Sequence, residues 1–505
     1  MTSKWQALQT RLAELHDLNM AHWILQWDQN TYMPPGGAEA RASQMATLQK
    51  IRHERLTSEE TARLIEEASQ EIEGAPFDSL EASLVRVARD DYQYASGLPT
   101  EFVERYANAT ATAFDVWRKA KAAKDYSIFL PALRRVTDLK MEEAQIRGYG
   151  DGHPYDVFLD VWERGISTAE VRRIFDAQRQ GLIDLLDQVE SVQDRVDDSV
   201  LHQPFDIDAQ RKLSKLVSTK FGFDYENWAT FDEAPHPFCL QIAREDIRLT
   251  TRFRPDFLNP AFYGTLHETG HGLHGHGFAP EIDGTFLSDM ESYSHAVCES
   301  QSRTWENLVG RSRAFWEWLY PQALEIFPEQ FGASSPEQLY KAANKARNQF
   351  LRVEADELTY NLHIMLRFDL EVAIVEGQLK LEDAPEAWND TFQQYFGITP
   401  ADDAEGIMQD VHWSVGGMGA FNGYALGNLL AVQYYNEALK AYPDMPDRIA
   451  KGDFETLLGW LTENIYQHGR KFNAEQLTER ITGTSIDAQP FVEYLKAKYT
   501  DVYGL

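Results

Sequence analysis

Apolar residues recur every three or four positions along most of this 505-residue chain, which is the spacing of one face of an α-helix. The pattern is clearest near the N-terminus and again in the middle of the chain, at Leu8, Leu12, Leu15, Leu18, Ile24, Ile174, Leu182, Leu185, Leu186 and Val189. The alternation and β-branched run that are typical of strands occur only near residues 238–253. We therefore predict a mainly α-helical fold with one small β-sheet.

Turn-forming sequences interrupt the helical pattern, but none of them resembles a flexible linker. They lie at residues 33–37, 148–155, 232–238, 275–284 and 396–406. The chain also has no internal repeat and no low-complexity tract. We therefore expect residues 1–505 to form a single domain.

The net charge of the chain limits the kinds of molecule that it can bind. A formal net charge of −31 argues against nucleic acid or an anionic membrane surface as a partner, because both would repel the chain.

Two cysteines, Cys239 and Cys298, cannot build a disulfide framework and favour a cytosolic location. The N-terminal residues follow a helical pattern that lacks a signal peptide's apolar core, and no run of 18 apolar residues could span a membrane.

The sequence H-E-x-x-H, residues 267–271, is the strongest chemical signal in the chain. If it lies on a helix, His267 and His271 share one face and can bind one metal ion with their imidazoles. Glu268 then lies beside the first ligand, where it can act as general base on a water molecule. The alternative is a histidine-rich surface helix, because four of the 14 histidines fall within ten residues here.

The residues around this motif favour a helix. Asn259 is a plausible N-cap and Pro260 suits the first helical position, while Gly275 and Gly277 can end the helix. Gly270 and Gly272 each weaken a helix by about 1 kcal/mol relative to alanine. Their presence indicates either close packing against a neighbouring element or simply a poor helix.

A catalytic zinc site needs a third protein ligand, and two glutamates downstream could provide it. Glu291 is the first, but Ser288 and Glu291 also spell the capping box S-x-x-E, which gives that glutamate a competing role. Glu299 would lie inside the helix that this box starts, on one stripe with His295 and Arg303, which could support it. The spacing favours Glu299 without excluding Glu291.

Taken together, the motifs resemble those of the carboxypeptidase Taq family of metallocarboxypeptidases, peptidase family M32. The shared segments are H-P-F at 236–238, D-x-R-x-T at 246–250, H-E-x-x-H at 267–271, E-S-Q at 299–301, R-x-x-A-D at 352–356 and G-x-x-Q-D-x-H-W at 406–413. The segment 27–41 is also similar to the opening of the family. Two positions depart from the pattern: Cys298 replaces a histidine, and Leu351 replaces isoleucine or valine.

The resemblance implies a helical fold of the neurolysin and angiotensin-converting-enzyme type, with a deep groove and a small sheet near the metal motif. It implies that residues 1–505 are one catalytic domain and that His267, His271 and Glu299 bind zinc, for which cobalt can substitute. It further implies that the protein releases single residues from the C-termini of peptides, is cytoplasmic and forms a homodimer.

Two residues are candidates for stabilising the oxyanion of the reaction, which requires a hydrogen-bond donor besides the metal. His412 lies in the G-x-x-Q-D-x-H-W segment, although it could instead be a buried histidine bonded to Asp410. Tyr424 is the second candidate, although tyrosines are mostly packing residues. Gln409 and Asp410 are expected to hold the second ring nitrogen of a ligand histidine.

An exopeptidase must also bind the free C-terminal carboxylate, for which the planar fork of arginine is suited. Arg352 is the first candidate, with an ion pair to Glu354, Asp356 or another carboxylate as the alternative. Arg248, in D-x-R-x-T, is the second candidate and could instead pair with Asp246. His236 could contact substrate or hold the sheet.

Two other functions remain open at this stage. A zinc oligopeptidase or endopeptidase could use the same helical scaffold and metal motif, and the segments around Arg352 and Arg248 argue against it. A non-enzymatic protein that binds peptide or metal is disfavoured by Glu268, because metal binding alone does not require that residue.

Overall fold

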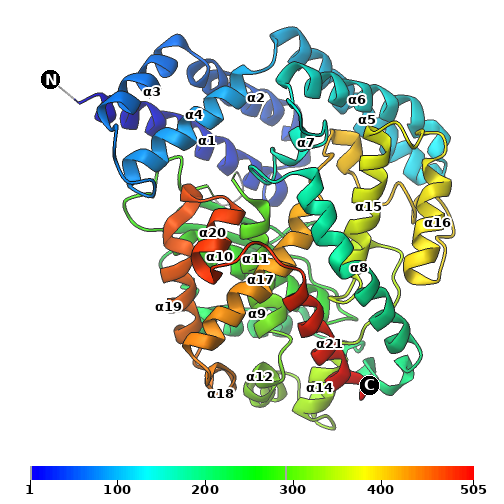
Figure 1. The fold of residues 1–505 in the computed structure, drawn as a ribbon. Helices are drawn as coiled ribbons and strands as arrows, with labels where there is room; N and C mark the ends of the chain where they lie inside the picture. Colours follow the sequence, from blue (N-terminus) through cyan, green and yellow to red (C-terminus); the bar gives the residue numbers. More distant parts are fainter. Residues whose placement is uncertain (1–2, 290–292) are drawn as a thin grey trace.

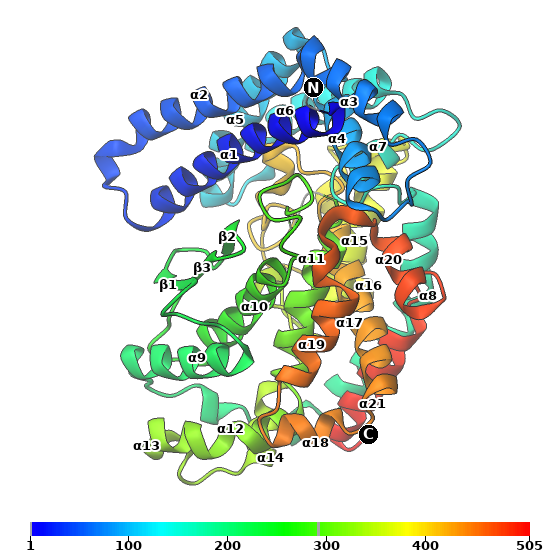
Figure 2. The ribbon, with the colours of Figure 1, turned by 90° about the vertical axis from the view of Figure 1, so that its left-hand side faces the viewer.

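The computed structural model describes residues 3–289 and 293–505, and most of them are helical (Figure 1). The N-terminal third consists of six long helices, α1 (Lys4–Thr31), α2 (Ala38–Leu56), α3 (Glu59–Glu71), α4 (Leu80–Ser96), α5 (Thr100–Ala123) and α6 (Tyr126–Arg147). Helices α1 and α2 pack together as a long hairpin whose far end lies over the small sheet (Figure 2).

A small separate core joins helices α1, α3 and α4. Leu8, Leu12 and Leu15 of α1 are buried in it, as the helical spacing predicts, whereas Ile24 on the same helix is exposed. The segment 278–287 contributes Phe278 to the same core. The N-terminal helices are thereby attached to the chain that follows the metal motif.

The sheet has three strands in the order β1-β3-β2, formed by β1 (Ala229–Glu233), β2 (Cys239–Ala243) and β3 (Asp246–Thr251). Strand β3 pairs in parallel with β1 and antiparallel with β2. Strands β2 and β3 lie where the sequence predicts them, whereas β1 was not predicted. The prediction of a mainly helical fold with a small sheet beside the metal motif is confirmed.

Three helices meet beside the sheet and form the centre of the molecule (Figure 2). They are α10 (Asn259–His276), α11 (His295–Arg303) and α17 (Asn422–Ala441), and α11 continues into a π-helical segment, Thr304–Val309. Helix α10 carries the motif H-E-x-x-H. The remaining helices enclose this centre and share its large hydrophobic core (Figure 1).

These enclosing helices are α7 (Asp156–Leu159), α8 (Thr168–Glu190), α9 (Ile207–Phe221), α12 (Arg313–Ile326), α13 (Pro328–Phe331), α14 (Pro336–Ala343), α15 (Tyr360–Val375), α16 (Ala384–Phe396), α18 (Met445–Ala450), α19 (Glu455–Asn464), α20 (Ala474–Thr482) and α21 (Gln489–Tyr503). Short 3₁₀ turns join several of them. None of the helices in the described ranges is long and apolar enough to cross a membrane.

The starts of α10 and α11 differ from the sequence predictions. Asn259 is the first residue of α10 and its side chain makes no capping hydrogen bond, so the helix begins one residue earlier than predicted. Helix α11 is capped by Ser294, whose hydroxyl accepts a hydrogen bond from the Val297 amide. The prediction that Ser288 starts this helix is therefore wrong, and Glu291, its proposed partner in the capping box, lies outside the described residues.

Candidate metal centre

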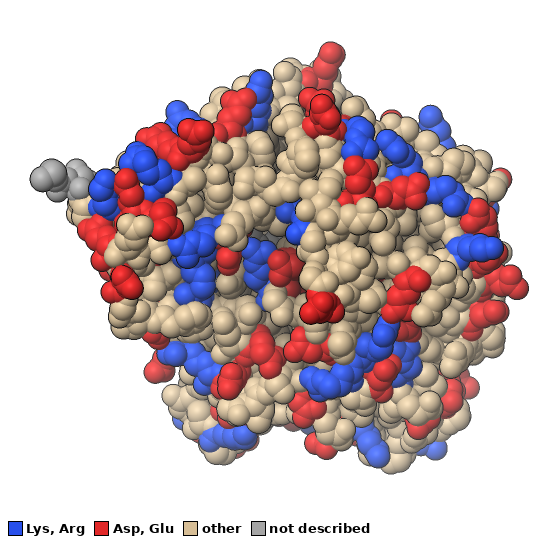
Figure 3. Space-filling model, turned by 45° about the horizontal axis from the view of Figure 1, so that its top comes forward, with Lys and Arg blue, Asp and Glu red and all other residues tan. Residues whose placement is uncertain are grey.

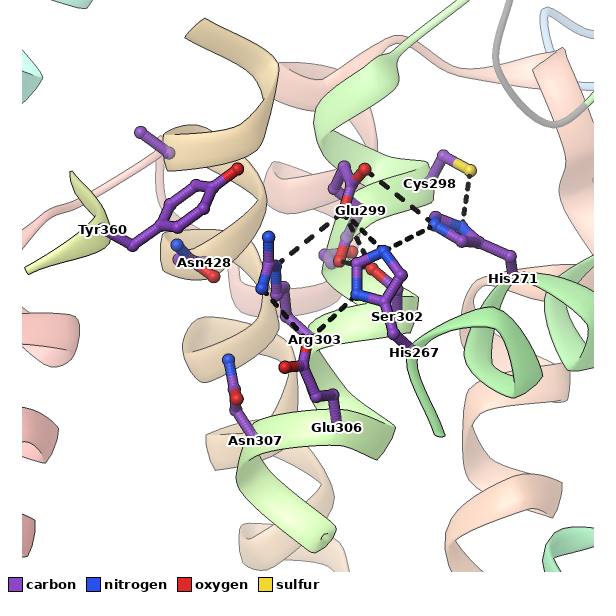
Figure 4. A network of polar contacts seen from close by, with 12 residues as sticks. His267, His271, Cys298, Glu299, Ser302, Arg303, Glu306, Asn307, Tyr360 and Asn428 are labelled. Carbon is purple, nitrogen blue, oxygen red and sulfur yellow. Dashed lines mark hydrogen bonds and ion pairs between the residues drawn. The ribbon is translucent and has the colours of Figure 1, made fainter. Parts of the chain in front are cut away.

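His267 and His271 lie one turn apart on α10, and their Nε2 atoms face each other at 3.3 Å (Figure 4). Glu299, on α11, faces the same point. Its Oε2 atom lies 3.6 Å from Nε2 of His267, and its Oε1 atom lies 3.9 Å from Nε2 of His271. One donor atom from each residue therefore falls within 4.8 Å of the others.

Glycines allow the ligand-bearing helices to approach this closely. A Cβ atom on Gly270 would lie 2.5 Å from the carbonyl oxygen of Gln301 and 2.6 Å from the Cα atom of Ser302, both close to Glu299 in sequence. A Cβ atom on Gly427 of α17 would lie 2.6 Å from the Cβ atom of Glu299. Of the two explanations that the glycines of α10 allow, close packing is the one observed, and it brings the three candidate ligands together.

This donor set fits a divalent metal ion. At zinc–nitrogen distances of about 2.0–2.1 Å, two nitrogens of a tetrahedral site lie about 3.3 Å apart. The observed Nε2–Nε2 separation of His267 and His271 is 3.3 Å, so their rings are already set at that spacing. Two imidazoles and one carboxylate are also the ligand set of some zinc peptidases, in which one coordination position stays open.

The second ring nitrogen of each histidine has a partner of its own (Figure 4). Nδ1 of His267 lies 3.0 Å from Oε2 of Glu306, and Nδ1 of His271 lies 3.1 Å from Sγ of Cys298. Such contacts fix the orientation of a ligand ring, with Nε2 toward the metal. The prediction that Gln409 and Asp410 hold these nitrogens is wrong, because both side chains are turned toward Arg352.

Glu306 was missed in the sequence, although it continues the stripe that holds Glu299 and Arg303. It lies in the π-helical segment, and such segments are frequent at functional sites. The guanidinium of Arg303 donates to its carboxylate at 3.0 Å. Burial opposes ionisation of Glu306, but Arg303 and His267 outweigh it and lower the pKa of the carboxyl to about 2.

Glu299 is held by the two residues that the sequence indicated as supports. Nε2 of His295 lies 3.5 Å from its Oε1 atom, and Nε of Arg303 lies 3.8 Å from its Oε2 atom. Burial opposes ionisation of Glu299, yet the nearby histidines and Arg303 hold the pKa of its carboxyl well below the usual range. The group is therefore a carboxylate, as a metal ligand must be.

The two histidines differ in their affinity for protons. Burial lowers the pKa of His271 to about 3, so its ring is neutral near pH 7. Burial also opposes protonation of His267, but the carboxylates of Glu299 and Glu306 outweigh it and raise the pKa of that ring. A metal ion at this candidate site would therefore compete with a proton mainly on His267.

Tyr424, His412 and Glu268 are the remaining candidates for chemistry. Tyr424, near the start of α17, packs its ring against that of His295, with 4.6 Å between the ring centroids. His412 begins a 3₁₀ turn and lies within electrostatic reach of the same histidine. Glu268 is buried on α10 beside His267. The structure thus brings Glu268, His412 and Tyr424 around the three metal-binding candidates.

Arg352 is buried and forms the ion pair that the sequence left open, with Asp410 as its partner. Its Nη2 atom donates to Oδ1 of Asp410 at 2.8 Å, and its Nη1 atom donates to the hydroxyl of Tyr360 at 2.8 Å. Arg367 binds the same aspartate from the other side, at 2.9 Å from Nε to Oδ2. Two guanidinium groups therefore share one carboxylate beside Tyr424.

The chain is similar to known proteins over almost its whole length. The family model described as carboxypeptidase Taq (M32) metallopeptidase matches residues 7–499. The chain is 39% identical to thermostable carboxypeptidase 1 of Thermus thermophilus over 490 residues, which cover 95% of this chain and 94% of the relative.

The chain belongs to the M32 family of metallocarboxypeptidases.

Further relatives agree with this assignment. The chain is 34% identical to thermostable carboxypeptidase 1 of Pyrococcus furiosus over 482 residues, which cover 95% of each chain. The crystal structure of the M32 carboxypeptidase from Deinococcus radiodurans superposes with a TM-score of 0.95 at 36% identity, covering 99% of this chain and 100% of that one. The chain is accordingly a metal-dependent carboxypeptidase that acts on peptides, and the alternative of an oligopeptidase is not favoured.

Arg248 lies on strand β3, and His236 lies in the loop between strands β1 and β2. Arg248 forms a two-pronged ion pair with Asp246, with both N–O distances at 2.8 Å, and its guanidinium also lies over the ring of Trp27 from α1, 4.8 Å from the centroid. His236 is exposed in the loop between β1 and β2. The sheet is thereby in contact with the N-terminal hairpin.

The surface of the molecule is hollowed near the centre of one face (Figure 3). Basic and acidic side chains both line this hollow, and both are spread over the surrounding surface. This face therefore carries charges of both signs rather than a patch of one sign.

Proposed function

We propose that His267, His271 and Glu299 bind Zn²⁺, with Co²⁺ able to substitute, and that the chain uses this ion to release single residues from the free C-termini of peptides. The convergence of one donor atom from each of the three residues within 4.8 Å supports this proposal most directly. When bound, the ion lowers the pKa of a water molecule and polarises the scissile carbonyl.

Glu268 is the proposed general base. It follows the first ligand on α10, and its buried carboxylate accepts a proton from the attacking water and transfers it to the nitrogen of the leaving residue. Its removal is expected to stop hydrolysis while metal and peptide still bind. Glu268 therefore carries chemistry that metal binding alone does not need.

His412 and Tyr424 are the proposed donors to the carbonyl oxygen as negative charge develops on it. Burial lowers the pKa of His412 to about 4, with Arg352 and Arg367 adding to the effect. The ring is therefore neutral near pH 7 and has an N–H to donate. Tyr424 provides a phenolic O–H beside His295.

Arg352 is the proposed binding group for the C-terminal carboxylate of the substrate. Arg352 and Arg367 together carry two positive charges against the single negative charge of Asp410. A second carboxylate would balance this surplus, and such pairing is strongest where water is excluded. Arg248, whose guanidinium lies over the ring of Trp27, is the second candidate, and exposed His236 is a further candidate contact.

One experiment tests the central proposal. The purified protein is incubated with an N-blocked peptide and with its C-terminally amidated twin, with and without a chelator, and products are identified by mass spectrometry. Loss of single residues from the free acid alone, stopped by the chelator, is the expected result. Cleavage of both peptides at internal bonds would overturn the exopeptidase assignment and the role of Arg352.

A cytoplasmic location and a homodimer complete the proposal. The small number of cysteines supports the first, and the family resemblance supports both. Sedimentation equilibrium of the purified protein measures the oligomeric state, and a monomer at micromolar concentration would contradict the dimer. Fractionation of the producing cells tests the location.

A further inference from the structure

The ring of His271 is held between the metal-binding point and a thiol (Figure 4). On one edge, its Nε2 atom faces His267 and Glu299, at 3.3 Å and 3.9 Å. On the opposite edge, its Nδ1 atom lies 3.1 Å from Sγ of Cys298, whose side chain is completely buried. No bulk water reaches this contact.

The two proposed ligand histidines therefore have unequal supports. Nδ1 of His267 faces the carboxylate of Glu306, which is a strong acceptor. A neutral imidazole that binds metal through Nε2 carries its proton on Nδ1, so His271 donates that proton toward a sulfur atom, which is a weak acceptor. Sulfur fixes the direction of the ring while adding little to its basicity.

We propose that Cys298 is a positioning residue, which orients His271 through Nδ1 and thereby sets the metal affinity of the site. This inference rests on the proposed metal site. Cys298 itself does not act as a ligand, because it lies beside Nδ1, on the edge of the ring that faces away from Glu299. Consecutive residues of a helix also point about 100° apart, so Cys298 and Glu299 of α11 serve opposite edges of the ring.

The test compares Cys298→Ala, Cys298→Ser and the wild type, with Cys239→Ser as the control because Cys239 is the other cysteine and lies on β2. The Zn²⁺ dissociation constant of chelator-stripped protein is measured by competition with a chelating dye. We expect binding to weaken by about 10- to 100-fold in Cys298→Ala, to weaken less in Cys298→Ser, whose hydroxyl still accepts, and to stay unchanged in Cys239→Ser.

Two further readouts distinguish the orientation of His271 by Cys298 from a purely structural role and from direct metal ligation. The thermal midpoint of metal-free Cys298→Ala should stay close to the wild-type value although its metal affinity falls. A purely structural role would lower the thermal midpoint as well. The Co²⁺-loaded wild type should lack an intense thiolate-to-cobalt charge-transfer band, since Cys298 is not a ligand. Equal affinity in Cys298→Ala and the wild type, equal losses in the alanine and serine variants, or such a band in the wild type would overturn the inference.

Failure of the underlying metal site has a different signature. In that case the wild type and every cysteine variant bind no Zn²⁺, whereas failure of the inference alone leaves the wild type with a normal site. The outcome for the wild type is therefore read first.

Discussion

Nδ1 of His267 lies 3.0 Å from Oε2 of Glu306, which follows it by 39 residues and occupies a π-helical segment. Glu306 also contacts the guanidinium groups of Arg303 and Arg311, at 3.0 Å and 3.4 Å. This arrangement keeps an ionised carboxylate against the outer nitrogen of a proposed metal ligand. It links the metal centre to a buried network of charges behind it.

Glu306→Gln should weaken Zn²⁺ binding by about 10- to 100-fold, because an amide is a poorer acceptor for the Nδ1 proton of His267. The Zn²⁺ dissociation constant and the thermal midpoint are measured for the variant and for Glu317→Gln, which changes an exposed glutamate on α12. Unchanged affinity in Glu306→Gln would show that the contact does not tune the metal.

Glu268→Gln should lower kcat by about 100- to 10,000-fold, since a positioned general base contributes a factor of that size. Bound zinc per chain and KM should stay close to the wild-type values, because Glu268 is not among the proposed ligands. Steady-state kinetics with a short peptide and elemental analysis provide both measurements. A variant that loses zinc along with activity would assign Glu268 to the metal site itself.

Arg352→Lys keeps the positive charge but loses the fork that holds Asp410 and Tyr360. We expect kcat/KM to fall by about 10- to 100-fold for every peptide with a free C-terminus, the effect of losing one charged hydrogen bond. Kinetics with a series of peptides that differ only in the last side chain measure this. A loss restricted to acidic last residues would refute a general carboxylate-binding role.

Gly270→Ala should destabilise the protein despite the better helix propensity of alanine, which is worth about 1 kcal/mol. The new Cβ would lie 2.5 Å from the carbonyl oxygen of Gln301, and overpacking of this kind costs about 1–3 kcal/mol. Gly459→Ala, on α19, is the matched control, because nothing lies within 4 Å of its Cβ. Urea unfolding should show opposite signs for the two variants, and a stabilised Gly270→Ala would contradict the close packing of α10 on α11.

The stability of the protein should fall on acidification, in part through His274. Burial lowers the pKa of this ring to about 3, against an ordinary value of about 6.5. Between these two pH values the unfolded chain binds one proton more, so the free energy of unfolding falls as pH falls, by up to about 1.4 kcal/mol per pH unit. Urea unfolding from pH 7 to pH 5 should give a shallower pH dependence for His274→Phe than for the wild type. Equal slopes would mean that His274 does not contribute.

Local patterns predicted the fold class, helix α1 and the region of strands β2 and β3. The spacing of apolar residues predicts α1 and the buried positions Leu8, Leu12 and Leu15, because helix geometry is periodic over a few residues. Gly270 on α10 also indicated close packing, because a residue without a Cβ atom lets a neighbouring backbone approach. Strand β1 escaped prediction, since its five residues become a strand only by pairing with β3.

The sequence by itself determined which residue types can perform the chemistry, because two histidines one helical turn apart share a face in any helix. Only the tertiary structure decided what supports them. Glu306 and Cys298, not Gln409 and Asp410, reach the outer nitrogens of the histidines, and Asp410 is instead held between Arg352 and Arg367. These choices depend on how α10, α11 and the segment around residue 410 pack in space, and such long-range contacts are set by the whole core rather than by any local spacing of residues.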